Sequence, residues 1–291
     1  MTLRHRSGLV VVDKPGGMTS HDVVARVRRL AGTRKVGHAG TLDPMATGVL
    51  VLGVERATRL LGHLMLTEKA YDATVRLGAA TTTDDAEGEV VATASTSGLD
   101  DGTIRAAAAT FVGTLQQVPS AVSAVRVDGK RAYARVRAGE SVELEPRTVT
   151  VHDLVVHGVR AGDGVYDLDI GVRCSSGTYI RAIARDLGRS LGVGGHLAAL
   201  RRTAVGPFTL DRARTLEQLA DRFEPVPLAD AARASFPSVD LSAEQAADVR
   251  FGRALDLDLQ GVTGVFDESG GFLALYEPRG GRARAVAVFV P

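Results

Sequence analysis

The amino-acid sequence predicts a mixed α/β fold for most of the chain, followed by a small β-rich domain at the C-terminus. Strand-like and helix-like segments alternate up to about residue 235, which is typical of mixed folds. From about Phe236 onward, short strand-like segments dominate. The length of 291 residues fits one large and one small domain. We therefore predict a large domain over residues 1–235 and a small domain over residues 236–291.

The first predicted elements are a buried strand and an amphipathic helix. Leu9–Asp13 is a short apolar run typical of a buried strand. Ser20 is a suitable N-cap for the helix, and Gly32 is a suitable C-terminal end. The apolar residues between them recur with helical spacing and form one stripe that we expect to face the core, namely Val23, Val24, Val27 and Leu30.

The later elements follow from the same apolar patterns. Ser120–Pro146 is basic and weakly periodic, so we expect an insertion that projects from the core. The other predicted elements are strands at Val49–Val54, Ala70–Leu77, Arg147–Val156 and Gly164–Cys174, helices at Arg56–Met65, Ile104–Phe111 and Thr178–Leu191, and C-terminal strands at Gly261–Phe266, Gly271–Glu277 and Ala283–Val290.

The composition excludes several classes of protein. No segment reaches the ~18 apolar residues of a membrane span, and the apolar run Leu9–Val12 is too short for a secretory signal. The single cysteine, Cys174, cannot form an intrachain disulfide, which agrees with a reducing compartment. The seven histidines show no metal-ligand spacing. We expect a cytoplasmic protein without a metal site or a membrane partner.

Positive charge is concentrated in three stretches, although the net charge is only +1. The stretches are Met1–Gly37, Ser123–Gly139 and Ser175–Arg202. We expect them to converge on one surface that binds a polyanion.

The segment Gly37–Gly48, GHAGTLDPMATG, is the most informative part of the chain. It places three glycines and a proline between a predicted helix and a buried strand, with Asp43 at its centre. An isolated Asp-Pro pair is most often a turn initiator. Here the aspartate shares its loop with His38, and the strand that follows would hold it rigidly. A fixed loop carboxylate is what nucleophilic catalysis requires.

Four motifs together resemble the TruB family of tRNA pseudouridine synthases. They are DKPGGMTS at Asp13–Ser20, GHAGTLDP within Gly37–Gly48, KAYDATVRLG at Lys69–Gly78 and CSSGTYIRAIARDLG at Cys174–Gly188. The resemblance implies a catalytic domain with an extended, mainly antiparallel sheet and a PUA-like C-terminal domain. It also implies that the protein isomerises the T-loop uridine of tRNA, position 55, to pseudouridine without any cofactor.

The resemblance assigns roles to individual residues. Asp43 matches the catalytic aspartate, and Arg181 matches the arginine that pairs with it and would lower its pKa by ~1 to 3 units. Tyr71 matches the tyrosine that stacks on the base and is a candidate to help remove the C5 proton. Further matches that contact the substrate or support the catalytic loop are His38, Tyr179, Leu200 and Lys14.

The basic insertion resembles the family's RNA-gripping thumb. Its candidate backbone contacts are Arg126, Lys130, Arg131, Arg135 and Arg137. Because the target base lies in a folded loop, we expect it to be flipped out of its stack. The implied partner is the T-arm of tRNA, with no guide RNA, no obligate protein partner and a monomer as the expected state.

Two other readings compete with this one. A non-catalytic RNA-binding or tRNA-folding protein on the same scaffold would share the fold without the chemistry. An aspartate-dependent phosphatase at Val165–Val172 is disfavoured, because Asp167 and Asp169 alternate with apolar residues as on a half-exposed strand. The residues leave open whether Asp43 attacks C1′, attacks C6 or acts through a glycal route.

Overall fold

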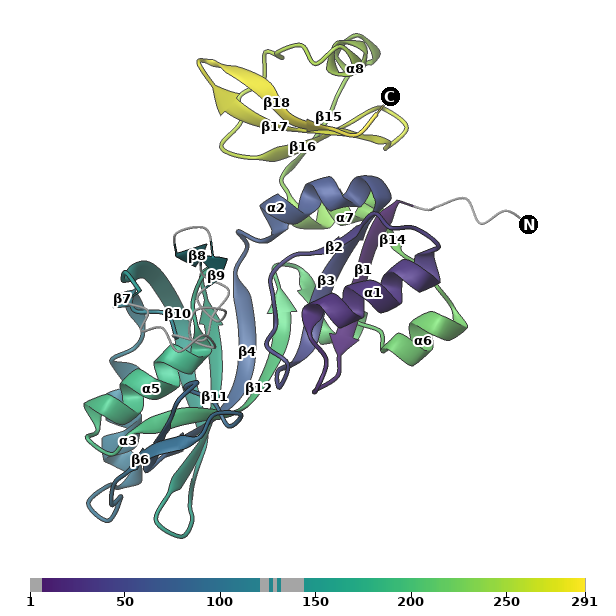
Figure 1. Ribbon diagram of the computed structural model, residues 1–291. Coiled ribbons are helices and arrows are strands. Elements are labelled where there is room, and N and C mark those ends of the chain that lie inside the picture. Colours follow the sequence, from purple (N-terminus) through teal and green to yellow (C-terminus); the bar gives the residue numbers. More distant parts are fainter. Residues whose placement is uncertain (1–6, 121–125, 128–129, 132–143, 291) are drawn as a thin grey trace.

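The computed structural model describes residues 7–120, 126–127, 130–131 and 144–290. A long twisted sheet forms the body of the molecule, and helices α1, α3 and α5 cover one of its faces (Figure 1). A small second sheet stands at one end, beyond α2 and α7. The expected mixed α/β fold with a β-rich C-terminal region is confirmed. The division of the chain at residue 235 stays a prediction.

The helices and strands have the following bounds. The helices are α1 (Ser20–Ala31), α2 (Leu61–Leu64), α3 (Asp101–Ala109), α5 (Ile180–Ser190), α6 (Leu216–Asp221), α7 (Leu228–Ser235) and α8 (Ala243–Arg250), with 3-10 turns η1 (Glu55–Leu60) and η2 (Leu210–Arg212). The strands are β1 (Gly8–Lys14), β2 (Val36–His38), β3 (Thr47–Val54), β4 (Lys69–Leu77), β5 (Ala79–Thr81), β6 (Val90–Thr93), β7 (Gly113–Gln117), β8 (Arg126–Val127), β9 (Lys130–Arg131), β10 (Arg147–Ala161), β11 (Tyr166–Cys174), β12 (Gly195–Val205), β13 (Phe208–Thr209), β14 (Val226–Pro227), β15 (Ser238–Asp240), β16 (Thr263–Phe266), β17 (Phe272–Arg279) and β18 (Arg282–Val288).

The large sheet is extended and mainly antiparallel, as the resemblance implies. Its strand order is β14-β1-β3-β12-β4-β11-β10-β7, and β2 and β13 pair at its sides. The pairing of β3 with β12 is parallel and covers only Thr47 with Arg201 and Gly48 with Arg202. Beyond this short contact the two halves of the sheet diverge, as Figure 1 shows. The loop before β3 therefore lies where the halves meet.

Three sequence predictions need correction. The N-cap of α1 is Thr19, whose hydroxyl accepts from the Asp22 amide, whereas Ser20 is the first helical residue. The predicted helix Arg56–Met65 is mostly a 3-10 turn, with only Leu61–Leu64 in α conformation. The strand Gly195–Val205 was not predicted, although it lies at the centre of the sheet. Arg201 and Arg202 interrupt its apolar run in the sequence, although Arg202 is itself buried in the fold.

The C-terminal sheet shares a hydrophobic core with the large sheet. Phe266, Phe272 and Phe289 pack in one buried cluster with residues of β1, β3, α2 and α7. The Phe272 ring lies 5.2 Å from that of Phe266 and 4.7 Å from that of Phe289, between centroids. The C-terminal region therefore stabilises the strands that carry the loop before β3.

Replacing Phe272 by alanine is expected to destabilise the whole protein. Removing a buried phenylalanine costs ~3 to 5 kcal/mol in lost burial and cavity formation, so urea unfolding should begin at a clearly lower concentration. Phe251→Ala is the matched control, because that ring is 75 % exposed and surface changes cost ~0.5 kcal/mol or less. Equal unfolding midpoints for the two variants would contradict a shared core.

Among the described residues, no helix is long and apolar enough to span a membrane.

Arg126–Val127 and Lys130–Arg131 of the insertion pair as a short antiparallel ladder. The other candidate thumb residues, Arg135 and Arg137, lie outside the described residues, as do the side chains of Arg126, Lys130 and Arg131.

Candidate active site

Asp43 lies in the loop between β2 and β3, and this loop is held by buried polar groups. The Ser20 hydroxyl donates to the Leu42 carbonyl at 3.1 Å and accepts from the Leu42 amide at 2.9 Å. The Lys14 ammonium group donates a hydrogen bond to the Pro44 carbonyl at 3.2 Å. Gly40 has a φ of 94°, a conformation that favours glycine. The peptides on both sides of Asp43 are therefore fixed.

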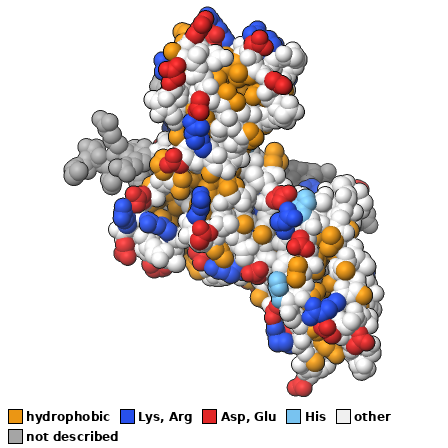
Figure 2. Space-filling model, turned by 180° about the vertical axis from the view of Figure 1, so that it is seen from behind, with side chains coloured by type: hydrophobic (Ala, Val, Ile, Leu, Met, Phe, Trp, Pro, Cys, Tyr) orange, Lys and Arg blue, Asp and Glu red, His pale blue; other side chains and the backbone are white. Residues whose placement is uncertain are grey.

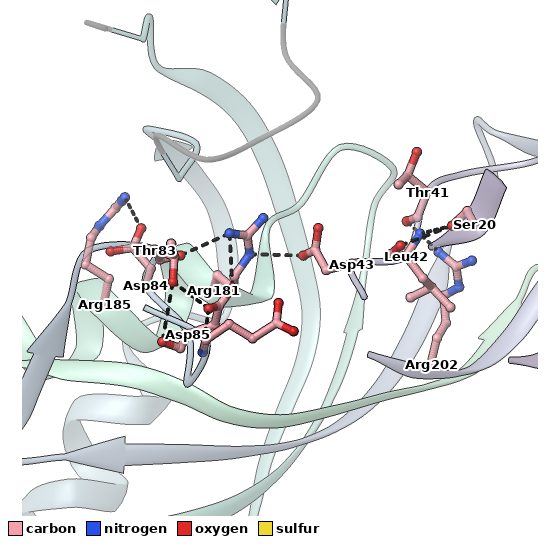
Figure 3. A network of polar contacts seen from close by, with 11 residues as sticks. Ser20, Thr41, Leu42, Asp43, Thr83, Asp84, Asp85, Arg181, Arg185 and Arg202 are labelled. Carbon is pink, nitrogen blue, oxygen red and sulfur yellow. Dashed lines mark hydrogen bonds and ion pairs between the residues drawn. The ribbon is translucent and has the colours of Figure 1, made fainter. Parts of the chain in front are cut away.

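Arg181 at the start of α5 binds the Asp43 carboxylate directly. Its Nε lies 3.0 Å from Asp43 Oδ2, and its side chain is 5 % exposed. The expected pairing of Arg181 with Asp43 is present in the geometry, and Figure 3 shows the carboxylate pointing at the guanidinium. A catalytic role for the pair stays a prediction.

A second carboxylate completes the arrangement, and sequence reasoning missed it. Arg181 Nη1 lies 3.3 Å from Asp85 Oδ2 and donates to the Thr83 carbonyl at 3.0 Å. The Asp85 carboxylate also accepts from the Thr83 hydroxyl at 2.5 Å and the Glu87 amide at 3.1 Å. Figure 3 shows this chain of contacts running from the turn after β5 to Asp43. Its signal in the sequence is the pair of aspartates in the run TTTDDAEG at 81–88, and no spacing there indicates that Asp85 lies beside Arg181.

Burial, and not the arginine, dominates the pKa of Asp43. Burial raises the pKa of this carboxyl above its usual value, the Arg181 guanidinium works against that rise, and the Asp85 charge adds to it. Arg181 therefore acts on the pKa of Asp43 in the expected direction, but burial outweighs it and the net shift is upward. The guanidinium stabilises the ionised form of a carboxyl that water solvates only in part.

A cavity of about 260 Å³ opens next to this ion pair. Of the residues singled out in the sequence, five line it together, namely Asp43, Tyr71, Tyr179, Arg181 and Leu200. They come from the β2–β3 loop, from β4, from the segment before α5, from α5 itself and from β12. The lining joins apolar and aromatic side chains with a few polar groups, which is the usual make-up of a small-molecule or base pocket.

Tyr71 and Tyr179 are positioned differently. Tyr71 is 8 % exposed, and burial raises the pKa of its phenol, so the hydroxyl is protonated at neutral pH. Tyr179 is held through its backbone by Gln117, whose amide group accepts from the Tyr179 N–H at 2.8 Å and donates to its carbonyl at 3.1 Å. Gln117 is buried and was not predicted. Its signal in the sequence is only a polar residue beside the insertion.

Lys14 and His38 do not belong to the residues that line the cavity. Lys14 is fully buried and donates to the carbonyls of Pro15, Met18 and Pro44, and burial lowers its pKa to about 8. The His38 ring meets the His21 ring edge-on, with centroids 5.6 Å apart. Lys14 thus supports the loop, and a substrate contact for either residue stays a prediction.

The third basic stretch, Ser175–Arg202, does not offer a free positive surface. Four of its five arginines are engaged inside the protein: Arg181 with Asp43, Arg185 with Asp84 and Asp186, Arg201 with Asp13, and Arg202 with backbone. On the rear, acidic and basic side chains are interspersed (Figure 2). Ion pairs of Arg76 with Asp167 and of Arg160 with Asp169 join neighbouring strands of the large sheet. The expectation that all three stretches converge on one surface is therefore wrong for this one.

Among the residues that the structure describes, no group of three or more His, Cys, Asp or Glu is arranged to hold a metal ion. The Asp43 carboxylate in the cavity wall is paired with the Arg181 guanidinium. These two side chains are suited to nucleophilic and electrostatic chemistry on a planar base.

Comparisons with known proteins match nearly the whole chain. Residues 28–180 match the TruB family pseudouridylate synthase N-terminal domain, residues 181–229 the tRNA pseudouridylate synthase B C-terminal domain, and residues 236–290 the tRNA pseudouridine synthase II C-terminal domain. Relatives named tRNA pseudouridine synthase B include one from Arthrobacter sp. (strain FB24), 57 % identical over 98 % of this chain and 97 % of its own. Another, from Rhodococcus jostii (strain RHA1), is 59 % identical over 98 % and 94 %.

Solved structures with a similar fold include a chain of a Cbf5-Nop10-Gar1 complex. It is 26 % identical, with a TM-score of 0.74 over 99 % of this chain and 86 % of that one. A chain from the structure of an H/ACA RNP bound to a substrate RNA containing 2′-deoxyuridine is 25 % identical, with a TM-score of 0.72 over 98 % and 85 %.

Proposed function

The chain belongs to the TruB family of pseudouridine synthases, isomerases that form pseudouridine in tRNA, and we propose that it acts on the T-loop uridine at position 55 with Asp43 as its nucleophile. The observation that carries the proposal is the Asp43–Arg181 ion pair at the edge of a base-sized cavity. The motif GHAGTLDP, which supplies Asp43, supports the same assignment.

The reaction needs few chemical groups. The N1–C1′ bond of uridine breaks, the uracil turns, and a C5–C1′ bond forms, while the proton of C5 leaves and N1 gains one. No electrons are exchanged with a redox partner. An ionised Asp43 attacks C1′, attacks C6 or assists a glycal route, and Arg181 keeps it anionic and oriented. The walls of the cavity keep the loosened uracil close to the sugar.

The base has to leave its stack to reach this cavity. Extruding it costs a few kcal/mol, which stacking on aromatic side chains and phosphate contacts offset. Tyr71 and Tyr179 supply aromatic surface in the cavity, and Leu200 supplies an apolar wall. We assign base stacking to Tyr71 and the lining of the pocket to Tyr179 and Leu200.

Incubation with an unmodified tRNA transcript tests this function. The isomerisation leaves the mass unchanged, so pseudouridine is detected by chemical labelling. We expect conversion by the protein alone, without guide RNA, because relatives that cover its length are named for tRNA. Binding without conversion would favour the alternative of a non-catalytic RNA-binding or tRNA-folding protein.

The basic insertion is proposed to grip the RNA backbone. Replacing Arg126, Lys130, Arg131, Arg135 and Arg137 by alanine should weaken tRNA binding and make its salt dependence shallower. The relevant slope is that of the logarithm of the binding constant against the logarithm of the salt concentration. Each lost contact to single-stranded-like RNA makes this slope shallower by ~0.7, so the loss of five contacts changes it by ~3 to 4 and the loss of two by ~1.4. The rate at saturating tRNA should change less than the affinity.

Affinities at several salt concentrations check this prediction. The matched control replaces Arg76 and Arg160, which pair with Asp167 and Asp169, and should leave the slope unchanged. Parallel lines with equal intercepts for the five-residue variant and the wild type would mean that the insertion does not touch RNA.

Activity is expected to survive chelation. The described site brings a carboxylate to a guanidinium, and neither step of the isomerisation calls for a Lewis acid. Pseudouridine formation should therefore be equal before and after exhaustive treatment with a chelator, provided that the tRNA stays folded. A loss that zinc restores, with tRNA folding shown to be intact, would refute this.

A further inference from the structure

Arg202 on β12 is a buried arginine in the wall of the candidate active-site cavity. Its side chain is 1 % exposed and is one of the largest fully buried side chains among the described residues. In the sheet, Arg202 pairs with Gly48 of β3 on one side and with Tyr71 of β4 on the other. A Cβ on Gly48 would lie 2.2 Å from the Arg202 carbonyl oxygen, so the backbones meet closely. Arg202 thus occupies the junction between the two halves of the sheet.

The guanidinium of Arg202 reaches both parts of the site. Its Nε donates to the Val49 carbonyl at 2.7 Å, Nη2 to Gly40 at 3.1 Å and Nη1 to Thr41 at 3.4 Å. Figure 3 shows it beside the loop segment Thr41–Leu42, on the side away from Arg181. Arg202 and Tyr71 also face each other in the β12–β4 ladder, and both side chains line the cavity. The guanidinium therefore binds the peptides just before Asp43 and stands on the strand next to Tyr71.

A purely structural explanation accounts poorly for this residue. Burying a charge is costly unless hydrogen bonds and an opposite charge compensate it. Within the described part of the chain, Arg202 forms no ion pair, and the Lys69 ammonium nearby adds to the positive charge. An apolar side chain of similar volume would fill the same space without this cost. What an apolar residue lacks is the planar fork of donors that can bind several acceptors in fixed directions.

We propose that Arg202 is a positioning residue for the isomerisation, whose guanidinium fixes the Asp43 loop relative to the strand that carries Tyr71. This inference rests on the proposed function, because it assigns Asp43 and Tyr71 to the same reaction. Arg202 lines the same cavity, but among the described residues its hydrogen bonds go to backbone carbonyls and not to the Asp43 carboxylate. It acts through the carbonyls of Gly40 and Thr41 and through its place beside Tyr71 in the sheet.

The charge of Arg202 also serves Tyr71 chemically. Burial raises the pKa of the Tyr71 phenol, and the Arg202 guanidinium opposes that rise. The neutral phenol can take up the C5 proton only after it has lost its own proton to solvent. The positive charge of Arg202 favours that ionised form of Tyr71.

The test separates binding from chemistry in single-turnover experiments with unmodified tRNA. Arg202→Lys keeps the charge and loses the fork, so we expect the rate constant at saturating tRNA to fall by about 10- to 100-fold. The affinity for tRNA should stay within about threefold. Arg76→Met is the control, because it removes a half-exposed arginine from β4 that pairs with Asp167, and should leave both values within threefold. Arg202→Gln, if it folds, should lose more than Arg202→Lys.

A double-mutant cycle tests the link to Tyr71. If Arg202 acts partly through the phenol, the loss caused by Arg202→Lys should be smaller in a Tyr71→Phe background than in the wild type. Losses that simply multiply would overturn that link. A folded Arg202→Lys variant with the wild-type rate, or one that loses only affinity, would overturn the positioning role. If the wild type and Arg76→Met form no pseudouridine, the proposed function fails instead.

Discussion

Asp43→Asn should abolish pseudouridine formation while the protein still binds tRNA. The amide keeps the shape of the side chain and removes the negative charge that attacks the nucleoside. We expect the single-turnover rate constant to fall by at least ~10³-fold, equivalent to ~4 kcal/mol of transition-state stabilisation. The affinity for tRNA should remain within tenfold, or ~1.4 kcal/mol, because the cavity and the RNA-binding surface are unchanged.

The matched control for this variant is Asp72→Asn. Asp72 follows Tyr71 on β4 but points to the opposite face of the strand and is exposed. It undergoes the same chemical change outside the cavity, so its rate and affinity should both match the wild type within about threefold. Substantial isomerisation by Asp43→Asn would show that Asp43 is not the nucleophile.

Arg181→Gln should slow the reaction and move its acid limb to higher pH. The Asp43 carboxylate reacts only when ionised, and burial already raises its pKa, with Arg181 opposing the rise. Without the guanidinium the pKa of Asp43 rises further, so a larger fraction is protonated at a given pH and activity is lost earlier as pH falls. At neutral pH we expect a loss of about 10²- to 10³-fold, ~3 to 4 kcal/mol.

Single-turnover rates from acid to neutral pH check this shift. Arg189→Gln removes a positive charge from an exposed position of the same helix, α5, and should leave the profile where the wild type has it. An Arg181→Gln profile with an unchanged or lower acid limb would mean that Arg181 does not stabilise the ionised carboxylate. The ion pair seen in the structure would then have no role in the reaction.

The elements with regular apolar patterns were predictable from the sequence. The stripe of α1 and the alternation in β4 each follow from spacing alone, and both faces are buried as expected. β12 was not predictable in this way. Arg201 and Arg202 interrupt its apolar run, and only the fold reveals that Arg202 is buried and bonded to backbone. A charged residue that is satisfied inside a protein looks like a surface residue in the sequence.

The residues of the candidate site also fall into those that the sequence predicts and those that only the fold reveals. Asp43, Tyr71 and Arg181 stand in motifs, and the structure brings all three to one cavity. Asp85 and Gln117 have no comparable motif, because their effect depends on long-range contacts with Arg181 and Tyr179. The net rise in the pKa of Asp43 was also missed, since the depth of burial of a loop carboxylate depends on the surrounding strands.

The most direct test of the account maps pseudouridine at nucleotide resolution in one tRNA transcript, after a single turnover with the wild type and with Asp43→Asn. A second transcript carries cytidine in place of the T-loop uridine at position 55. We expect label at position 55 of the first transcript with the wild type only, and none in the second. Label at another uridine, or label at position 55 with Asp43→Asn, would contradict it.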